Sequence, residues 1–299
     1  MLGAFTEKGA VKNVFFNTNH LKEQHFHVNT WIGRSVIFQK ISGIIERMIM
    51  LNDIIKTILN HRSVRHFEDR PLTDEQIRLI VECAQAASTS SYMQAYSIIG
   101  VKNIQTKKKL AELAGNQAYV EKSGHLFIFC ADLHRHEVIG EMEGKNVEDS
   151  LRSTEKFMVA LIDAALAAQN AALAAESMGL GICYIGGIRN NLEEVSKLLK
   201  IPNKVIPLFA LTVGYPAKET AKKPRIPFEH IYHEEEYKQD QEAYVRELEQ
   251  YNEIVSNYYD QRTNGIRKDT WTGQMARMLS NPTRMYIKQF VEKKGLNLN

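Results

Sequence analysis

The residues best suited to chemistry in this 299-residue chain fall into four short clusters. The first, at 61–67, reads HRSVRHF and combines His61, Arg62, Ser63 and Arg65. A guanidinium group donates two parallel N–H bonds that match two oxygens of a phosphate, and a hydroxyl adds a further donor. The cluster therefore indicates a phosphate site, and a solvated basic turn of the same composition is the alternative.

The second cluster, at 88–94, reads STSSYMQ and places four serine and threonine hydroxyls beside the amide of Gln94. Together with Ser88 and Ser90, this amide can hydrogen-bond the polar edge of an aromatic ring system. A plain polar loop between two elements has the same composition. The loop alone therefore does not decide between a binding role and a simple connection.

The other two clusters are a pair of glycines and a basic segment that contains two prolines. Gly186 and Gly187 follow an apolar run, and without a Cβ their backbone can approach a ligand closely. The segment 222–227 reads KKPRIP and carries Lys222, Lys223 and Arg225, and its two prolines stiffen the backbone. A simple turn and an ordinary basic loop are the alternatives for these two clusters.

Other catalytic chemistries have little support in the sequence. It contains no G-x-S-x-G nucleophile motif and no H-E-x-x-H zinc motif. We interpret His134 and His136 as part of a solvated turn, and Glu141 and Glu143 as part of a solvated charged loop. The three cysteines are too few and too scattered for a disulfide framework or a zinc site, so we expect buried thiols and no bound metal.

The composition is that of an ordinary globular protein and argues against several classes of partner. Apolar residues make up 44% of the chain, charged residues make up 24%, and the net charge is only +3. Because no basic stripe is interleaved with aromatic residues, nucleic acid is not an expected partner. The most apolar long stretch, 157–178, contains Asp163 and Glu176, so we expect a core helix and no membrane span.

Hydrophobic periodicity and turn residues place these clusters between the elements of a mixed α and β fold. Thr73 and Gln76 have the spacing of a capping box at the start of one helix. No G-x-G-x-x-G motif follows the first strand, which argues against a dinucleotide-binding fold. We expect strands at 96–101, 125–132, 181–185 and 208–214. We expect helices at 52–60, 74–87, 105–114, 157–178, 191–200 and 235–260, with shorter ones after Thr270 and Pro282.

The first 49 residues differ from the rest of the chain because they lack a steady hydrophobic period. No apolar core followed by a small-residue cleavage site is present, which argues against a secretory signal. Met50 directly precedes the first regular helix. We therefore interpret 1–49 as a non-native or disordered extension and 50–299 as the folded domain, with a helical extension over 230–299.

Taken together, the clusters resemble the nitroreductase superfamily, in particular its flavin reductase and oxygen-insensitive nitroreductase branch. The matching runs are HRSVRHF, AASTSSYMQ, GNQAYVEKSGHLFIFCAD, AAESMGLGICYIGG, KKPRIP and RTNGIRKDTW. Any one of these runs is a weak signal, whereas six in the same order and spacing across residues 50–299 are a strong one. The sequence is most similar to the bacillus-type FMN-containing NAD(P)H oxidoreductases.

The resemblance implies an α+β fold with a central, mostly antiparallel sheet surrounded by helices. It also implies an intertwined homodimer with FMN at the subunit interface. The residues that would hold FMN are His61, Arg62, Ser63, Arg65, Ser88, Ser90, Gln94, Gln117, Tyr184, Ile185, Gly186, Gly187, Lys223 and Arg225. Arg262 and Arg267, with Lys268 beside them, would face NADPH, and NADH is the alternative hydride donor.

The activity that the resemblance implies is a ping-pong hydride transfer from NADPH to FMN and then to free flavin, nitroaromatics, quinones or similar acceptors. FMN carries this chemistry, so we expect no catalytic side chain. An FMN-storage or redox-sensing protein with incidental turnover is the alternative, because it needs the same FMN contacts. Only the segment 262–268, which would face the nicotinamide cofactor, separates the two. We expect a cytoplasmic protein in either case.

Overall fold

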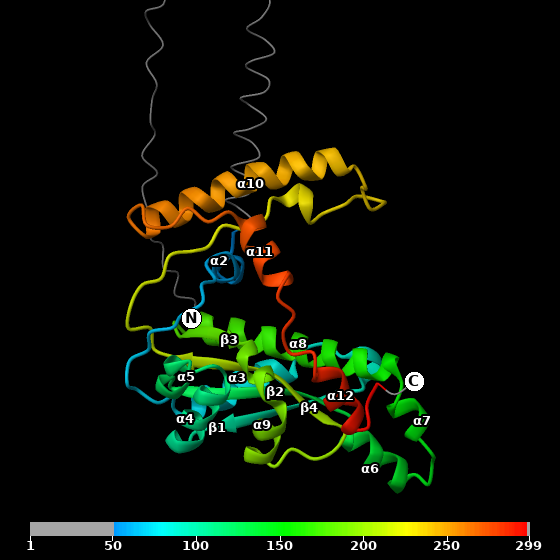
Figure 1. Cartoon of the computed structure of the whole chain (residues 1–299). Coiled ribbons are helices and arrows are strands. Elements are labelled where there is room, and N and C mark those ends of the chain that lie inside the picture. The colour runs from blue at the N-terminus through cyan, green and yellow to red at the C-terminus, as the bar shows by residue number, and fades with distance from the viewer. Residues whose placement is uncertain (1–50, 298–299) are drawn as a thin grey trace, which may run out of the picture. The chain divides into compact units, whose positions relative to one another are not determined.

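A computed structural model describes residues 51–297, so the interpretation of 1–49 lies outside the described residues. Four strands form one antiparallel sheet in the order β1-β2-β4-β3 (Figure 1). The strands are β1 (Tyr96–Val101), β2 (His125–Asp132), β3 (Gly181–Ile185) and β4 (Val205–Gly214). The bounds of β1, β2 and β3 agree with the prediction, and the predicted α+β fold class is confirmed.

Helices cover both faces of this sheet. α3 (Asp74–Gln85) and α8 (Thr154–Ser177) pack on one face, while α4 (Ile104–Leu113) and α9 (Leu192–Leu198) pack on the other (Figure 1). The central strand β2 is buried along its whole length because both of its edges and both of its faces are covered. Its sequence is therefore apolar almost throughout and does not alternate with polar residues.

The long helix α8 belongs to this core, as its polar residues predicted. It is the one helix within residues 51–297 that has the length and hydropathy of a membrane span. Its buried face consists mainly of alanines and packs against α3 and the sheet. The opposite face exposes Met158, Ile162 and Leu166, which are four residues apart and therefore form one stripe.

Shorter elements connect these layers. The predicted capping box at the start of α3 is confirmed, because Thr73 accepts the N–H of Gln76 and its own N–H donates to the Gln76 side chain. Two short helices, α5 and α7, were not predicted. The connecting elements are α2 (Asp53–Leu59), η1 (Ser90–Tyr92), α5 (Ala118–Lys122), α7 (Glu148–Leu151), η2 (Gly186–Asn190) and η3 (Phe228–His230).

Helix α6 (His134–Met142) occupies the segment for which a solvated turn and a charged loop were predicted, and that prediction is wrong. The segment contains His134, His136, Glu141 and, as the C-cap, Glu143. Asp132 stabilises the start of the helix by accepting the backbone N–H of His134 at 3.0 Å. Among its residues only Gly140 is buried, so the hydrophobic periodicity that reveals other helices is missing here.

Three helices form the C-terminal extension: α10 (Gln241–Arg262), α11 (Trp271–Leu279) and α12 (Ile287–Lys293). α10 begins six residues later than predicted and packs against α11. Although α10 is 22 residues long, it buries only Tyr251 and Val255. α12 returns to α9 and contributes to the core. Most of the surface of α10 is therefore uncovered within one chain.

The backbone after β3 approaches the end of α4 so closely that one position requires glycine. A Cβ on Gly187 would lie 2.3 Å from the carbonyl oxygen of Ala114 and 2.7 Å from Nε2 of Gln117. A Cβ on the neighbouring Gly186 would meet only the flexible side chain of Arg189, at 3.2 Å. The two glycines thus differ in how much space surrounds them.

We predict that Gly187→Ala lowers the free energy of unfolding by roughly 1–3 kcal/mol, because the backbone of α4 or of the glycine must move. The matched control Gly186→Ala should change it by less than about 0.5 kcal/mol, since a flexible side chain can yield. Urea denaturation of the two variants measures the difference. Equal losses in both would contradict the close approach at Gly187.

His125 begins β2 as a buried polar residue. Its side chain is 2% exposed, and neither ring nitrogen has a hydrogen-bond partner among residues 51–297. Burial lowers the pKa of His125 from 6.5 to about 4, and the nearby ammonium groups of Lys102 and Lys107 act in the same direction. The folded protein therefore holds a neutral imidazole at neutral pH.

We expect this group to make the protein less stable in mild acid. Below pH 6.5 the unfolded chain binds a proton that the folded chain excludes, so the free energy of unfolding falls as the pH drops towards 4. By pH 5 the loss from His125 should be about 2 kcal/mol. In His125→Gln, which does not titrate, urea denaturation at pH 7.5 and 5 should show a pH dependence smaller by that amount. An unchanged dependence would contradict the lowered pKa.

Candidate functional site

The basic turn at 61–65 is fixed to the edge strand β3 by its backbone. β3 is the last strand of the sheet, and Ser63 pairs with Ile182 of this strand in a parallel bridge. The N–H of Val64 donates to the carbonyl oxygen of Ile182 at 2.8 Å. Gly181 leaves the space for this contact, because a Cβ there would lie 2.7 Å from Cγ2 of Val64. The charged side chains of the turn remain available for other contacts.

Seven of the predicted site residues come together around one small pocket of about 60 Å³, which we call the basic pocket. Its lining comes from the turn at 61–65, from the segment after β4 and from the end of α10. The lining residues are His61, Arg62, Ser63, Arg65, Thr220, Ala221, Lys223, Arg225, Tyr258 and Arg262. None of these described lining residues is acidic, and guanidinium groups in such a setting are suited to phosphate.

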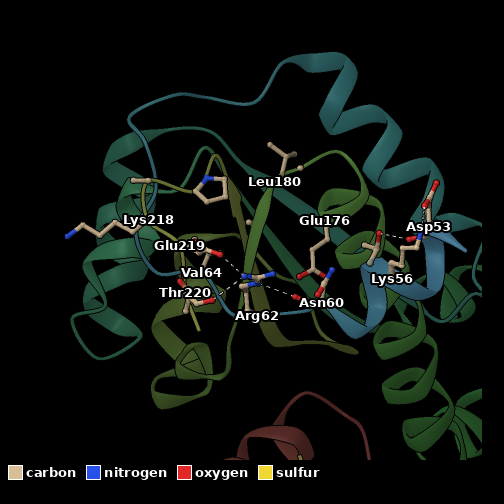
Figure 2. A pocket seen from close by; sticks show the side chains of 15 residues that line it. Asp53, Lys56, Asn60, Arg62, Val64, Glu176, Leu180, Lys218, Glu219 and Thr220 are labelled. Carbon is tan, nitrogen blue, oxygen red and sulfur yellow. Dashed lines mark hydrogen bonds and ion pairs between the residues drawn. The ribbon is translucent and has the colours of Figure 1, made fainter. Parts of the chain in front are cut away.

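Two carboxylates approach the basic pocket from outside its lining. Glu219, whose side chain is 91% exposed, lies 3.5 Å from Nη1 of Arg62. Glu176 at the end of α8 lies 2.7 Å from Nδ1 of His61. Figure 2 shows Arg62, Glu176 and Glu219 in the wall of a neighbouring cavity of about 630 Å³. An exposed ion pair such as Arg62–Glu219 contributes little stability, so an anionic ligand can replace it.

A line of contacts connects the basic pocket to the glycines after β3. The guanidinium of Arg65 lies 6.0 Å from the ring centre of Tyr119. The hydroxyl of Tyr119 donates to Oε1 of Gln117, and Nε2 of Gln117 donates to the carbonyl oxygen of Ala114 at 2.7 Å. Burial raises the pKa of Tyr119, so its hydroxyl stays protonated at neutral pH. Gly187 packs against the same amide of Gln117.

The two predicted residues that end β3 point to opposite sides of the strand. Tyr184 is 37% exposed, and its hydroxyl donates to Oε1 of Gln169 at 3.4 Å. Burial raises the pKa of Tyr184, and the charge of Glu176 adds to this effect. Ile185 is only 1% exposed and packs in the core below the sheet. Only the backbone of Ile185 can therefore contact a ligand.

The polar loop of Ser88, Ser90 and Gln94 lies apart from the basic pocket in the same chain. The N–H of Ser90 donates to Asp163 of α8 at 2.9 Å, whereas His61 contacts Glu176 of the same helix. From 163 to 176 are 13 residues, which correspond to about 20 Å along an α-helix. One chain therefore does not bring the two clusters together.

The two arginines predicted to face the nicotinamide cofactor differ in their surroundings. Arg262 lines the basic pocket, and its Nη1 donates to the hydroxyl of Tyr258 at 3.0 Å. Arg267 is not among the lining residues of that pocket. Its Nε donates to Asp269 at 2.8 Å, and its guanidinium lies 4.3 Å from the ring centre of Tyr259. Only Arg262 is placed with the phosphate-suited groups.

Several residues at the site were not predicted to have a role. Tyr119 was part of a matching run, but nothing in its spacing indicated the contact with Arg65. Thr220 and Tyr258 belong to no motif. Asp163 and Glu176 could have been found from the sequence, because charged residues in an alanine-rich helix need partners when they are buried.

Comparison with known proteins agrees with this geometry. Residues 58–215 match the model of the nitroreductase family, and residues 223–299 match the model of its C-terminal domain. The chain is 53% identical over 249 residues to the FMN reductase (NADPH) of Bacillus subtilis, with 83% of this chain and 100% of that protein covered. It is 41% identical over 249 residues to an NADPH-dependent oxidoreductase of Staphylococcus aureus, with 83% and 99% covered.

Solved structures give the same result. The structure of NfrA1 from B. megaterium is 70% identical in sequence and superposes with a TM-score of 0.82, covering 82% of this chain and 100% of that one. The NADPH:FMN oxidoreductase of Vibrio harveyi, solved in complex with NAD+, is 36% identical with a TM-score of 0.75, covering 83% and 100%. The sheet, the flanking helices and the sequence matches lead to one conclusion: this chain belongs to the nitroreductase family.

Proposed function

We propose that this chain is an NADPH-dependent FMN oxidoreductase that delivers hydride to small acceptors. The basic pocket carries the proposal, because five permanently cationic side chains converge there without an acidic lining residue. Such a pocket suits phosphate, which both FMN and NADPH contain. The names of the relatives in Bacillus subtilis and Vibrio harveyi, an FMN reductase (NADPH) and an NADPH:FMN oxidoreductase, support the same cofactors.

The residues of this chain fit FMN in two parts. The phosphate and ribityl end would be held by His61, Arg62, Ser63, Arg65, Lys223 and Arg225. The ring would lie along the backbone of Ile185, Gly186 and Gly187, beside Tyr184 and the amide of Gln117. When bound, FMN supplies the redox chemistry by accepting a hydride and passing it on. The chain's own groups bind the cofactor, orient it and supply positive charge near it.

We propose further that two chains share each flavin site in a homodimer. The polar loop of Ser88, Ser90 and Gln94 is about 20 Å along α8 from the basic pocket, so the loop of a second chain would complete the site. An exposed apolar stripe on α8 and the mostly uncovered helix α10 support such an interface. This arrangement agrees with the homodimer that the family resemblance implies.

The proposed acceptors follow from the flavin site, and the proposed cellular location follows from the cysteines. Because the cofactor carries the chemistry, any small acceptor that reaches it can be reduced, and we propose free flavin, nitroaromatics and quinones. The three cysteines Cys83, Cys130 and Cys183 are free thiols, which fits a cytoplasmic enzyme. No nucleic acid or membrane is needed for this function.

Anaerobic reduction with NADPH tests the proposed function. The purified protein should be yellow, and adding NADPH without oxygen should remove the visible flavin absorbance within seconds. A yellow protein that keeps its absorbance would support FMN storage or redox sensing instead. A colourless protein that does not bind added FMN would contradict both readings.

We predict that Arg262 selects NADPH over NADH. Arg262→Ala should raise the KM for NADPH about tenfold and the KM for NADH less than about twofold, because only NADPH carries a 2′-phosphate. Arg267→Ala should have a smaller effect, since its guanidinium is bonded to Asp269. Steady-state rates with both donors measure this, and exposed Arg246→Ala on the same helix is the control. Equal effects on the two donors would contradict the assignment.

A further inference from the structure

The polar loop at 88–94 has a backbone conformation that its own residues do not favour. Ser91, Tyr92 and Gln94 have φ angles of 49°, 59° and 54°. This left-handed region strains residues that have a Cβ. Three such residues within four positions persist only if bonds from outside the loop hold them.

Asp163 on α8 supplies two of these bonds. Its side chain is completely buried, with Oδ1 accepting the N–H of Ser90 at 2.9 Å and Oδ2 accepting the N–H of Ala95 at 3.0 Å. These two amides lie immediately before and after the segment 91–94, which contains the three strained residues. One rigid carboxylate therefore fixes both ends of the strained segment. A hydrogen bond to a charged, buried acceptor is among the stronger ones in proteins.

Helix α6 holds the carbonyl groups of the same segment. Nη1 of Arg135 donates to the carbonyl oxygen of Gln94 at 3.2 Å. Nε2 of His136 lies 2.9 Å from the carbonyl oxygen of Met93, so it donates there when it carries the proton. Asp163 thus holds the loop through N–H groups from one side, and α6 holds it through carbonyl groups from another.

We propose that Asp163 is a positioning residue for the flavin site, with Arg135 as a second clamp on the same loop. It keeps Ser88, Ser90 and Gln94 in the arrangement in which they meet the FMN of the partner chain. A loop that is already ordered loses little conformational entropy when FMN binds, so the affinity for FMN depends on the bonds that hold the loop. This inference rests on the proposed function, because it needs the polar loop to contact FMN.

Asp163→Asn tests the clamp with little change in volume. The amide nitrogen of Asn cannot accept, so one of the two backbone N–H groups loses its partner. In the full-length protein without FMN, the amides of residues 90–95 should exchange their hydrogens at least tenfold faster. The dissociation constant for FMN, measured by flavin fluorescence, should rise at least tenfold.

Two further variants separate positioning from general stability. Val159→Ala removes buried side-chain volume from the same helix without removing a hydrogen bond to the loop, so it should lower stability but leave loop exchange and the FMN dissociation constant within twofold. Arg135→Met changes an exposed residue and should fold normally. It should raise the FMN dissociation constant roughly threefold. If Asp163→Asn does not fold, Arg135→Met alone tests the positioning role of the clamp.

The outcomes distinguish this inference from the proposed function. If the unmodified protein binds no FMN, the proposed function fails, whatever the loop does. If it binds FMN but Asp163→Asn and Arg135→Met bind it equally well, the positioning role is overturned. Unchanged amide exchange in Asp163→Asn would overturn the clamp itself, and an equal loss of FMN affinity in Val159→Ala would assign Asp163 a general structural role.

Discussion

The separation that α8 imposes on two groups of side chains is the constraint on which the proposed site depends. Near one end of this helix Glu176 contacts His61 at 2.7 Å, and 13 residues earlier Asp163 contacts the loop at Ser90 at 2.9 Å. Because the alanine face of α8 is packed against the sheet, this spacing of about 20 Å is fixed. In the function that we propose, each chain therefore carries two parts of a flavin site that it does not join. The proposed dimer pairs the unlike parts of two chains, and the uncovered α10 and the apolar stripe on α8 are surfaces that suit such an interface.

Most of the fold could be predicted because the central strands β2 and β4 are buried on both faces and all four strands read as short apolar runs. β4 begins at Val205, three residues before its predicted start, and so includes Pro207. In the structure Pro207 lies opposite Cys130, at an irregularity in the pairing of β2 with β4, where a proline is tolerated. Helix α6 was not predicted because it forms at the surface, with Asp132 at its start, and has no apolar face that would reveal it.

The site was predictable only where its residues are neighbours in the sequence. The turn at 61–65 reveals its chemistry directly, because its donors are consecutive. Lys223 and Arg262 lie beside this turn because of the path that the chain takes after β4 and the position of the end of α10. No spacing in the sequence encodes either of these. The family resemblance supplied that connection. The different position of Arg267 arises from a bond to Asp269, two residues away, which composition alone does not indicate.

Hybrid dimers test the shared site most directly. One variant, Arg65→Ala, weakens the basic pocket, and the other, Ser88→Ala with Gln94→Ala, weakens the polar loop. Each should bind FMN weakly as a homodimer. In a hybrid of the two, purified by different tags, the intact pocket of one chain meets the intact loop of the other, so one tightly bound FMN per dimer is predicted. If hybrids bind FMN no better than the parent homodimers, both halves of the site come from one chain, and the account is contradicted.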